Sequence, residues 1–155
     1  MWALMFVLGA GLALRRLMIG TGMTNARFHL SFAAAFLLYS VGWTVAWFAL
    51  RNKAGEWLGS FVGTALMTLV FVAAFSAWRS AAKIFAGLFI AHSLGYFVGE
   101  LLYLAIASRL GMLLWGLVYG LGFGAGIGYA LFVSANSPRV VPRSPSNDES
   151  KLAER

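Results

Sequence analysis

The stretch IFAGLFIAHSLGYFVGELLYLAIA, residues 84–107, decides the fold. It is apolar almost throughout, contains no proline and carries one charged side chain, Glu100. At ~1.5 Å per residue, a helix over this run is about 36 Å long, which exceeds the ~30 Å hydrocarbon core of a bilayer. The stretch therefore predicts a transmembrane helix.

Three further runs have the same character. They span residues 28–50, 57–78 and 111–134, and no proline precedes Pro138. The separators between consecutive runs are short and charged, so neighbouring helices must form antiparallel hairpins. Trp57 and Trp78 stand at the two ends of one run, where aromatic side chains anchor a helix at both interfaces. We expect an all-α, polytopic transmembrane helical bundle with four long spans, in a single domain over residues 1–134.

The two ends of the chain are less regular. Residues 1–14 are apolar, but as a helix they would be only about 21 Å long. They predict a short first span anchored by Arg15 and Arg16, and a helix lying in the membrane interface is the alternative. Residues 135–155 are rich in proline and serine and too poor in apolar groups to fold alone, which predicts a flexible cytoplasmic tail.

Composition separates this chain from soluble proteins. Apolar residues make up 61% of the chain and charged residues 11%. The chain contains no cysteine. Soluble domains have about 45–50% apolar and ~25% charged residues. The values exclude a soluble enzyme, a nucleic-acid-binding domain and a secreted disulfide scaffold, although the net charge is +7. We expect a lipid bilayer around the chain and no nucleic-acid partner.

The basic residues indicate the orientation in the membrane. Because cytoplasmic segments carry the excess of Lys and Arg, the side with the larger group should be cytoplasmic. This predicts a multi-pass protein of the cytoplasmic (inner) membrane with its C-terminus inside. The larger group is Arg15, Arg16, Arg27, Arg79, Lys83, Arg139, Arg143, Lys151 and Arg155, and the smaller is Arg51, Lys53 and Arg109.

Glycines recur at four-residue intervals along the last two runs. In lipid, close backbone approach along ridges of small residues is a main source of helix association. We expect these ridges to pack the last two helices together or to form a subunit interface in a homo-oligomer. A second ridge on the last run, about 160° away, has no assigned partner. The first ridges comprise Gly87, Ala91, Gly95 and Gly99, then Gly116, Gly120, Gly124 and Gly128, and the second comprises Gly122, Gly126 and Ala130.

Four polar residues share one face of run 84–107. Offsets of 4, 8 and 11 residues place His92, Tyr96, Glu100 and Tyr103 near one another on a helix. A charged acid within a span costs at least ~2.5–3.5 kcal/mol, so such a residue usually faces a cavity, a partner or a pathway. With a histidine beside it, the stripe suits a proton or solute site. The alternative is that the stripe makes hydrogen bonds that hold helices together.

Cofactor, metal and catalytic sites find little support. A haem would need axial ligands, and the two histidines, His29 and His92, lie about 10 Å apart along the membrane normal. A haem or pigment held by one histidine per chain stays open, but we expect no cofactor. No spacing gathers three good metal ligands, and no Gly-x-Ser-x-Gly motif is present. We therefore expect no metal and no enzyme.

Two functions remain. The first is a small oligomeric transporter or channel that uses the His92, Tyr96, Glu100 and Tyr103 stripe as its proton or solute site. The second is a non-catalytic structural or accessory subunit of a larger membrane complex, to which a haem, pigment or lipid could bind. In that case the glycine ridges contact partner subunits and the polar stripe is structural.

Overall fold

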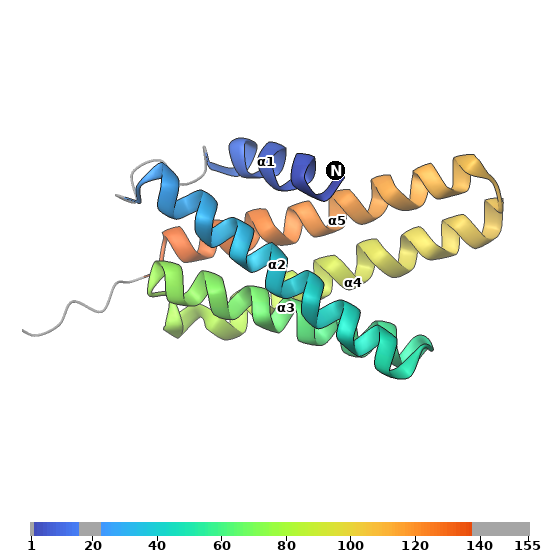
Figure 1. Ribbon diagram of the computed structural model, residues 1–155, viewed down its shortest axis with the longest axis horizontal. Coiled ribbons are helices and arrows are strands. Elements are labelled where there is room, and N and C mark those ends of the chain that lie inside the picture. The colour runs from blue at the N-terminus through green and yellow to red at the C-terminus, as the bar shows by residue number, and fades with distance from the viewer. Residues whose placement is uncertain (1, 16–22, 138–155) are drawn as a thin grey trace, which may run out of the picture.

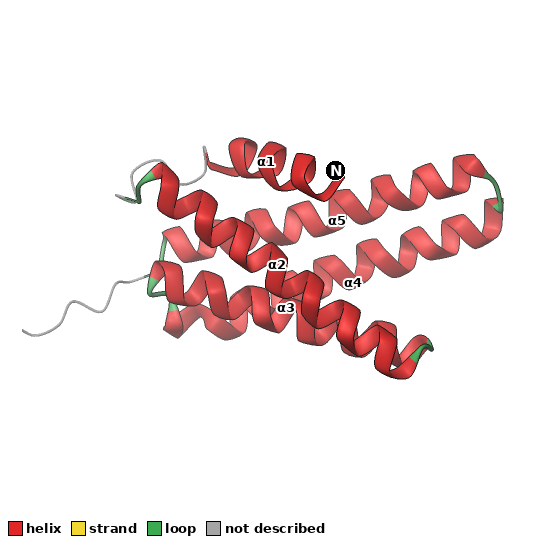
Figure 2. Ribbon diagram, viewed as in Figure 1, coloured by secondary structure: helices red, strands yellow, loops and turns green. Residues whose placement is uncertain are grey.

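A computed structural model describes residues 2–15 and 23–137, with the side chains of residues 9–15 and 23–137. The tail is outside the described residues from position 138 onward, so its flexibility stays a prediction. The described residues contain helices and no strand, which confirms the all-α prediction (Figure 2). The elements are α1 (Trp2–Arg15), α2 (Asn25–Leu50), α3 (Lys53–Phe75), the short 3-10 helix η2 (Trp78–Ser80), α4 (Ala81–Ile106) and α5 (Arg109–Ala135).

Within the described residues, four helices are long and apolar enough to cross a membrane: α2, α3, α5 and the continuous segment Trp78–Ile106 that contains α4. Their outer surfaces carry large apolar side chains, among them Leu30, Leu94 and Leu113, which are 74%, 59% and 69% exposed. Such surfaces are stable against lipid chains and unfavourable in water. The chain is a multi-pass membrane protein built as a helical bundle.

The bundle consists of two antiparallel hairpins, α2–α3 and α4–α5, which cross each other (Figure 1). Both turns lie at the same end, which we call the hairpin end, and the tail end holds the start of α2 and the end of α5. Helix α1 lies beside α2 and α5 toward the tail end, where Gly11 approaches His29 and Phe32, and Leu14 approaches Gly128. At ~1.5 Å per residue α1 is about 21 Å long, so it covers only part of their length.

Tight turns enforce the antiparallel hairpins. Arg51 and Ala107 adopt left-handed conformations with φ of 48° and 43°, which end α2 and α4. The next residues, Asn52 and Ser108, accept hydrogen bonds from the backbone of the first turns of α3 and α5. Each chain reversal therefore takes two residues.

The caps also explain why α3 differs from run 57–78. Because Asn52 caps it, the helix begins at Lys53, and it ends at Phe75 because Ser76 has a left-handed φ of 56°. Trp78 lies in η2 instead. The expectation that Trp57 and Trp78 mark the two ends of one helix is wrong.

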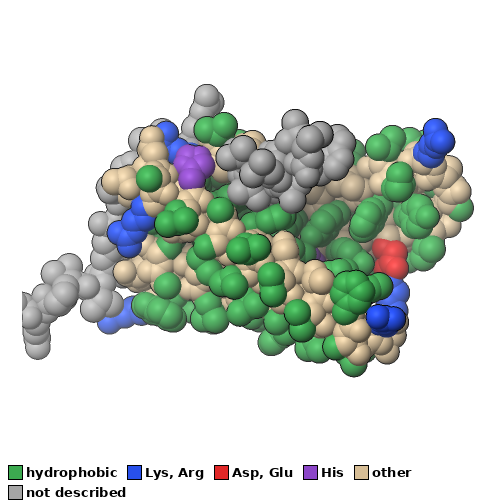
Figure 3. Space-filling model, in the orientation of Figure 1, with side chains coloured by type: hydrophobic (Ala, Val, Ile, Leu, Met, Phe, Trp, Pro, Cys, Tyr) green, Lys and Arg blue, Asp and Glu red, His purple; other side chains and the backbone are tan. Residues whose placement is uncertain are grey.

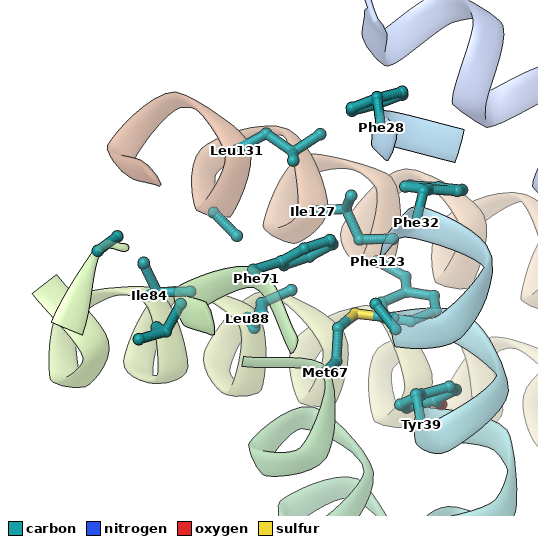
Figure 4. Packing of buried hydrophobic residues seen from close by; sticks show 14 residues of the cluster. Phe28, Phe32, Tyr39, Met67, Phe71, Ile84, Leu88, Phe123, Ile127 and Leu131 are labelled. Carbon is teal, nitrogen blue, oxygen red and sulfur yellow. The ribbon is translucent and has the colours of Figure 1, made fainter. Parts of the chain in front are cut away.

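An apolar core fills the bundle toward the tail end. Figure 4 shows Phe32 of α2, Phe71 of α3 and Ile127 of α5 directed into the space between the helices, and each is at most 2% exposed. Side chains from all four long helices therefore meet here, and they close this end of the bundle. The cluster includes Phe28, Phe32, Ala35, Met67, Phe71, Val72, Ile84, Leu88, Phe123, Ile127, Ala130 and Leu131.

The α4–α5 hairpin packs through glycine, but through the second ridge of α5. A Cβ on Gly95 would lie 3.1 Å from the Cα of Gly122, and a Cβ on Gly126 would lie 3.1 Å from the Cβ of Ala91. The glycine-ridge packing of the last two helices is confirmed for the α4 ridge, since Gly87 and Gly99 also contact α5 side chains.

The expectation that the first ridge of α5 packs against α4 is wrong for the described residues. No atom of another described helix lies within 4 Å of a Cβ built on Gly116, Gly120 or Gly124, and a Cβ on Gly128 would meet only Leu14 of α1. The physical reason is that the two ridges lie about 160° apart, so only one of them can face α4. Gly122 and Gly126 take that face, where Ala91 and Gly95 of α4 approach them. The use of the first ridge as an oligomer interface stays a prediction.

Two alanine substitutions test this packing. Gly122→Ala should lower the free energy of unfolding by about 1–3 kcal/mol, because its Cβ would lie 2.7 Å from the Ala91 oxygen and from the Gly95 Cα. Gly124→Ala should leave stability unchanged or raise it by up to ~1 kcal/mol, since alanine favours helix. Unfolding in mixed detergents measures both. Equal losses would mean that α5 faces α4 differently.

Candidate functional site

A cleft lies between α2 and α5 toward the hairpin end, with α4 as its floor. It consists of three adjacent cavities of about 320, 250 and 210 Å³. The first two share Tyr96 and Trp115, and the last two share Tyr119; α4 and α5 alone line the first. We call it the α2–α5 cleft. Its lining residues are Phe36, Tyr39, Ser40, Trp43 and Thr44 of α2, Tyr96, Glu100 and Tyr103 of α4, and Met112, Trp115, Gly116, Tyr119, Gly120 and Phe123 of α5.

The surface around the cleft is largely hydrophobic. Figure 3 shows apolar side chains over most of the visible face, with acidic atoms in one place beside basic side chains at the hairpin end. Gly116 and Gly120 form part of the α5 wall, so the first glycine ridge leaves room in the cleft instead of packing on α4.

A hydrogen-bonded group of three side chains lies at the deep end of the cleft. The Tyr39 hydroxyl oxygen lies 2.5 Å from Nε2 of His92 and 2.8 Å from the Tyr119 hydroxyl. If Tyr119 donates to Tyr39 and Tyr39 donates to Nε2, the ring proton of His92 is on Nδ1. This Nδ1 atom is buried and has no hydrogen-bond partner among the described residues. Tyr39 and Tyr119 line the cleft, whereas His92 is fully buried behind them. The two hydroxyls therefore connect the cleft to the buried imidazole.

Aromatic rings form the middle of the cleft. The ring of Tyr96 lies parallel to that of His92, with centroids 6.2 Å apart. It meets Trp115 and Tyr119 edge-on at 6.0 and 5.8 Å, and Trp43 lies 6.0 Å away on the α2 side. Such pairs are favourable geometries for aromatic side chains, and they hold the walls in place.

An ion pair lies at the hairpin end of the cleft. Nζ of Lys53, the first residue of α3, contacts Oε1 of Glu100, and it also lies 2.8 Å from Oε2 of Glu56. The ammonium lies 5.7 Å from the ring centroid of Phe97. Glu100 is six residues before the end of α4, so the α4–α5 hairpin extends about 9 Å beyond its contact with α3. The ion pair joins the two hairpins.

The polar stripe of α4 is divided between two environments. Tyr96, Glu100 and Tyr103 line the cavity of about 320 Å³, together with Met112 and Trp115. His92 does not line it and reaches the cleft through Tyr39 and Tyr119. The role of the stripe as a proton or solute site stays a prediction.

The partners of the α4 stripe on other helices are not among the residues predicted from the sequence. Tyr39 and Tyr119 lie in the interior of their spans, where a phenol needs a hydrogen-bond partner, and this position was an available signal. Lys53 was treated only as an indicator of orientation. Its position next to an apolar run gives no sign that it reaches Glu100 on another hairpin.

The two histidines cannot share one iron. His29 contacts the backbone oxygen of Asn25 at 2.8 Å. Tyr39, which binds His92, lies ten residues further along α2, or about 15 Å. Among the described residues, no group of three His, Asp or Glu side chains comes together in a way that could hold a metal ion.

Comparison with known proteins adds no function. No protein-family model, no curated protein and no solved structure matches the chain. The cleft itself offers apolar and aromatic contact surface, one carboxylate at its hairpin end and a tyrosine–histidine group at its deep end. These groups can hold a small molecule and can accept or donate a proton.

Removal of the Tyr39 hydroxyl tests the buried group. Tyr39→Phe leaves Nε2 of His92 with only Tyr119 at 3.4 Å, and an unpaired buried polar group costs about 1–3 kcal/mol. Tyr129→Phe is the matched control, because Tyr129 is 45% exposed. We expect the unfolding free energy to fall by this amount in Tyr39→Phe alone. Equal values for the two variants would show that the hydrogen bond does not contribute.

Proposed function

We propose that the protein is a small membrane transporter that takes a solute into the α2–α5 cleft and exchanges it for a proton. The observation that carries this proposal is the asymmetry of the cleft. Glu100 and Tyr103 are partly accessible at the hairpin end, whereas the apolar core around Phe32 and Ile127 fills the opposite end. A cleft that an apolar core closes toward one end of the bundle suits one state of an alternating-access transporter.

The polar groups have distinct roles in this proposal. Glu100 holds either the solute or a proton at the hairpin end, and Lys53 pairs with its carboxylate when neither is bound. Tyr96 separates this pair from the buried His92, which Tyr39 and Tyr119 connect to the cleft. The filled core favours a transporter over an open channel, because the hairpins must move before a solute can pass.

The second candidate function is an accessory subunit of a larger membrane complex. One observation favours it, which is the face of α5 that carries Gly116, Gly120 and Gly124 without a described atom within 4 Å of their Cβ positions. Such a face suits close contact with a helix of another subunit or of a second copy. Mild detergent extraction separates the functions, since a stoichiometric foreign partner supports this one.

A proton-exchange assay tests the transporter. Liposomes with an acidic lumen and the trapped pH dye pyranine receive external benzyl alcohol, benzenesulfonate or benzyltrimethylammonium. We expect at least one of these aromatic solutes to speed the loss of the pH gradient in wild-type liposomes. Glu100→Gln should return the rate to that of protein-free liposomes, because an amide does not exchange a proton near neutral pH.

Glu149→Gln provides the control for this assay. It makes the same change of carboxyl to amide after the last helix, and it should retain the wild-type rate. If each solute changes the rate of pH-gradient loss equally in liposomes with wild-type protein and in liposomes with Glu100→Gln, the protein is not a transporter of this kind.

Cysteine labelling tests the proposed inner-membrane orientation. The chain has no cysteine, so Ala107→Cys at the hairpin end and Asn136→Cys after α5 each introduce a single thiol. A membrane-impermeant maleimide added to intact cells should label Ala107→Cys and leave Asn136→Cys unlabelled until the cells are opened. The reverse pattern would place the C-terminus outside.

A further inference from the structure

The charges at the hairpin end of the cleft favour a cationic ligand. Lys53 contributes one ammonium, and Glu56 and Glu100 contribute two carboxylates, so the formal charge of this group is −1. Arg51 lies 5.7 Å from the ring centroid of Phe48. Among the described residues, neither Arg51 nor Arg109 pairs with these carboxylates.

One oxygen of Glu100 is available to a ligand. Lys53 contacts Oε1, and Oε2 has no partner among the described residues. Glu100 lines the cavity of about 320 Å³ beside the rings of Tyr96, Tyr103 and Trp115. A cation that enters this cavity would therefore meet a carboxylate and aromatic rings together.

The other residues that line the cleft carry no charge. The cleft is lined by aromatic, apolar, hydroxyl and glycine residues, and Glu100 is the one charged side chain among them. Aromatic faces attract organic cations, most strongly where water is excluded. An anion would find no basic side chain in the lining and would be repelled by the Glu100 carboxylate.

We propose that the α2–α5 cleft binds an organic cation with apolar or aromatic substituents, with its cationic centre held between Glu100, Tyr96 and Trp115. This inference rests on the proposed function and names the class of its solute. The apolar part extends along Trp43 and Tyr119, past Gly116 and Gly120, where the lack of side chains leaves space.

Lys53 competes with the ligand for Glu100. In the empty cleft its ammonium contacts both Glu56 and Glu100. A bound cation replaces the ammonium at Glu100, and Lys53 retains its partner Glu56, so neither charge loses its counter-ion. Lys53 therefore weakens cation binding, and Glu56 assists it by drawing Lys53 away.

Equilibrium binding tests the ligand class. Purified full-length protein in detergent is titrated with radiolabelled benzyltrimethylammonium, and neopentylbenzene, in which carbon replaces the nitrogen, and benzenesulfonate serve as competitors. We expect saturable binding of the cation and at least about tenfold weaker competition by both others. Equal competition by neopentylbenzene would overturn the proposal, because the site would then recognise only shape.

Variants with opposite expected signs test the mechanism. Glu100→Gln should weaken binding about tenfold or more, whereas Lys53→Met should tighten it about three- to tenfold by removing the competing ammonium. Glu56→Gln should weaken it about threefold, because Lys53 then pairs with Glu100 alone. A misfolded variant cannot bind more tightly, so tightening by Lys53→Met supports the proposal and weakening overturns it.

The aromatic contribution has its own matched pair. Trp115→Leu should weaken binding about three- to tenfold, and Trp115→Phe should retain most of it because a ring remains. Trp78→Leu is the control, since Trp78 is 60% exposed near the tail end and does not line the cleft. Equal binding by Trp115→Leu and wild-type protein would contradict a cation held against this ring.

The binding assay and the proton-exchange assay distinguish failure of the cation site from failure of the transporter. Cation binding that depends on Glu100, without any proton exchange, supports the cation site and overturns the transporter. Proton exchange driven by benzyl alcohol or benzenesulfonate, without cation binding, overturns the cation site and leaves the transporter standing.

Discussion

The structure depends on the close backbone contact between α4 and α5. Gly95 and Gly122 lie so near each other that a Cβ on Gly122 would be 2.7 Å from the Cα of Gly95. This approach sets the rotation of both helices about their axes. It turns Tyr96 of α4 and Tyr119 of α5 toward the same side, where their rings meet at 5.8 Å. In a bilayer no hydrophobic force draws helices together, so packing of this kind has to supply the specificity.

The two hairpins are held together differently at their two ends. Toward the tail end, apolar side chains from all four long helices form one core. At the hairpin end, the ion pair between Lys53 and Glu100 joins them, together with the stacked rings of Trp57 and Phe97, whose centroids are 4.1 Å apart. The Lys53 and Glu100 side chains are 59% and 26% exposed, and such pairs contribute roughly 0–1 kcal/mol. A contact of this strength can yield to a ligand, whereas the core cannot.

The sequence predicts those features that lie within one helix. Run lengths and short separators predict four antiparallel helices because hydrocarbon thickness and turn length leave few alternatives. The stripe on α4 follows from helical periodicity alone. The choice between the two ridges of α5 could not be made this way, since Gly120 and Gly122 belong to ridges of equal spacing. The contact between Lys53 and Glu100 could not be predicted from the sequence either, because it depends on how far one hairpin extends beyond the other.

Glycine has two roles in α4 and α5, and the helix face decides between them. On α4, Gly99 makes room for Trp115, since a Cβ there would lie 2.6 Å from the Cδ1 atom of its indole, and so this glycine positions a wall of the cleft. On α5, Gly116 and Gly120 meet no described atom and leave the cleft open beside that same indole. Glycines at four-residue spacing therefore allow close packing on one helix face and leave open space on another. Larger residues on the first face of α5 would fill the cleft without strengthening the hairpin, which is a physical reason for glycine at positions that pack against nothing in the described chain.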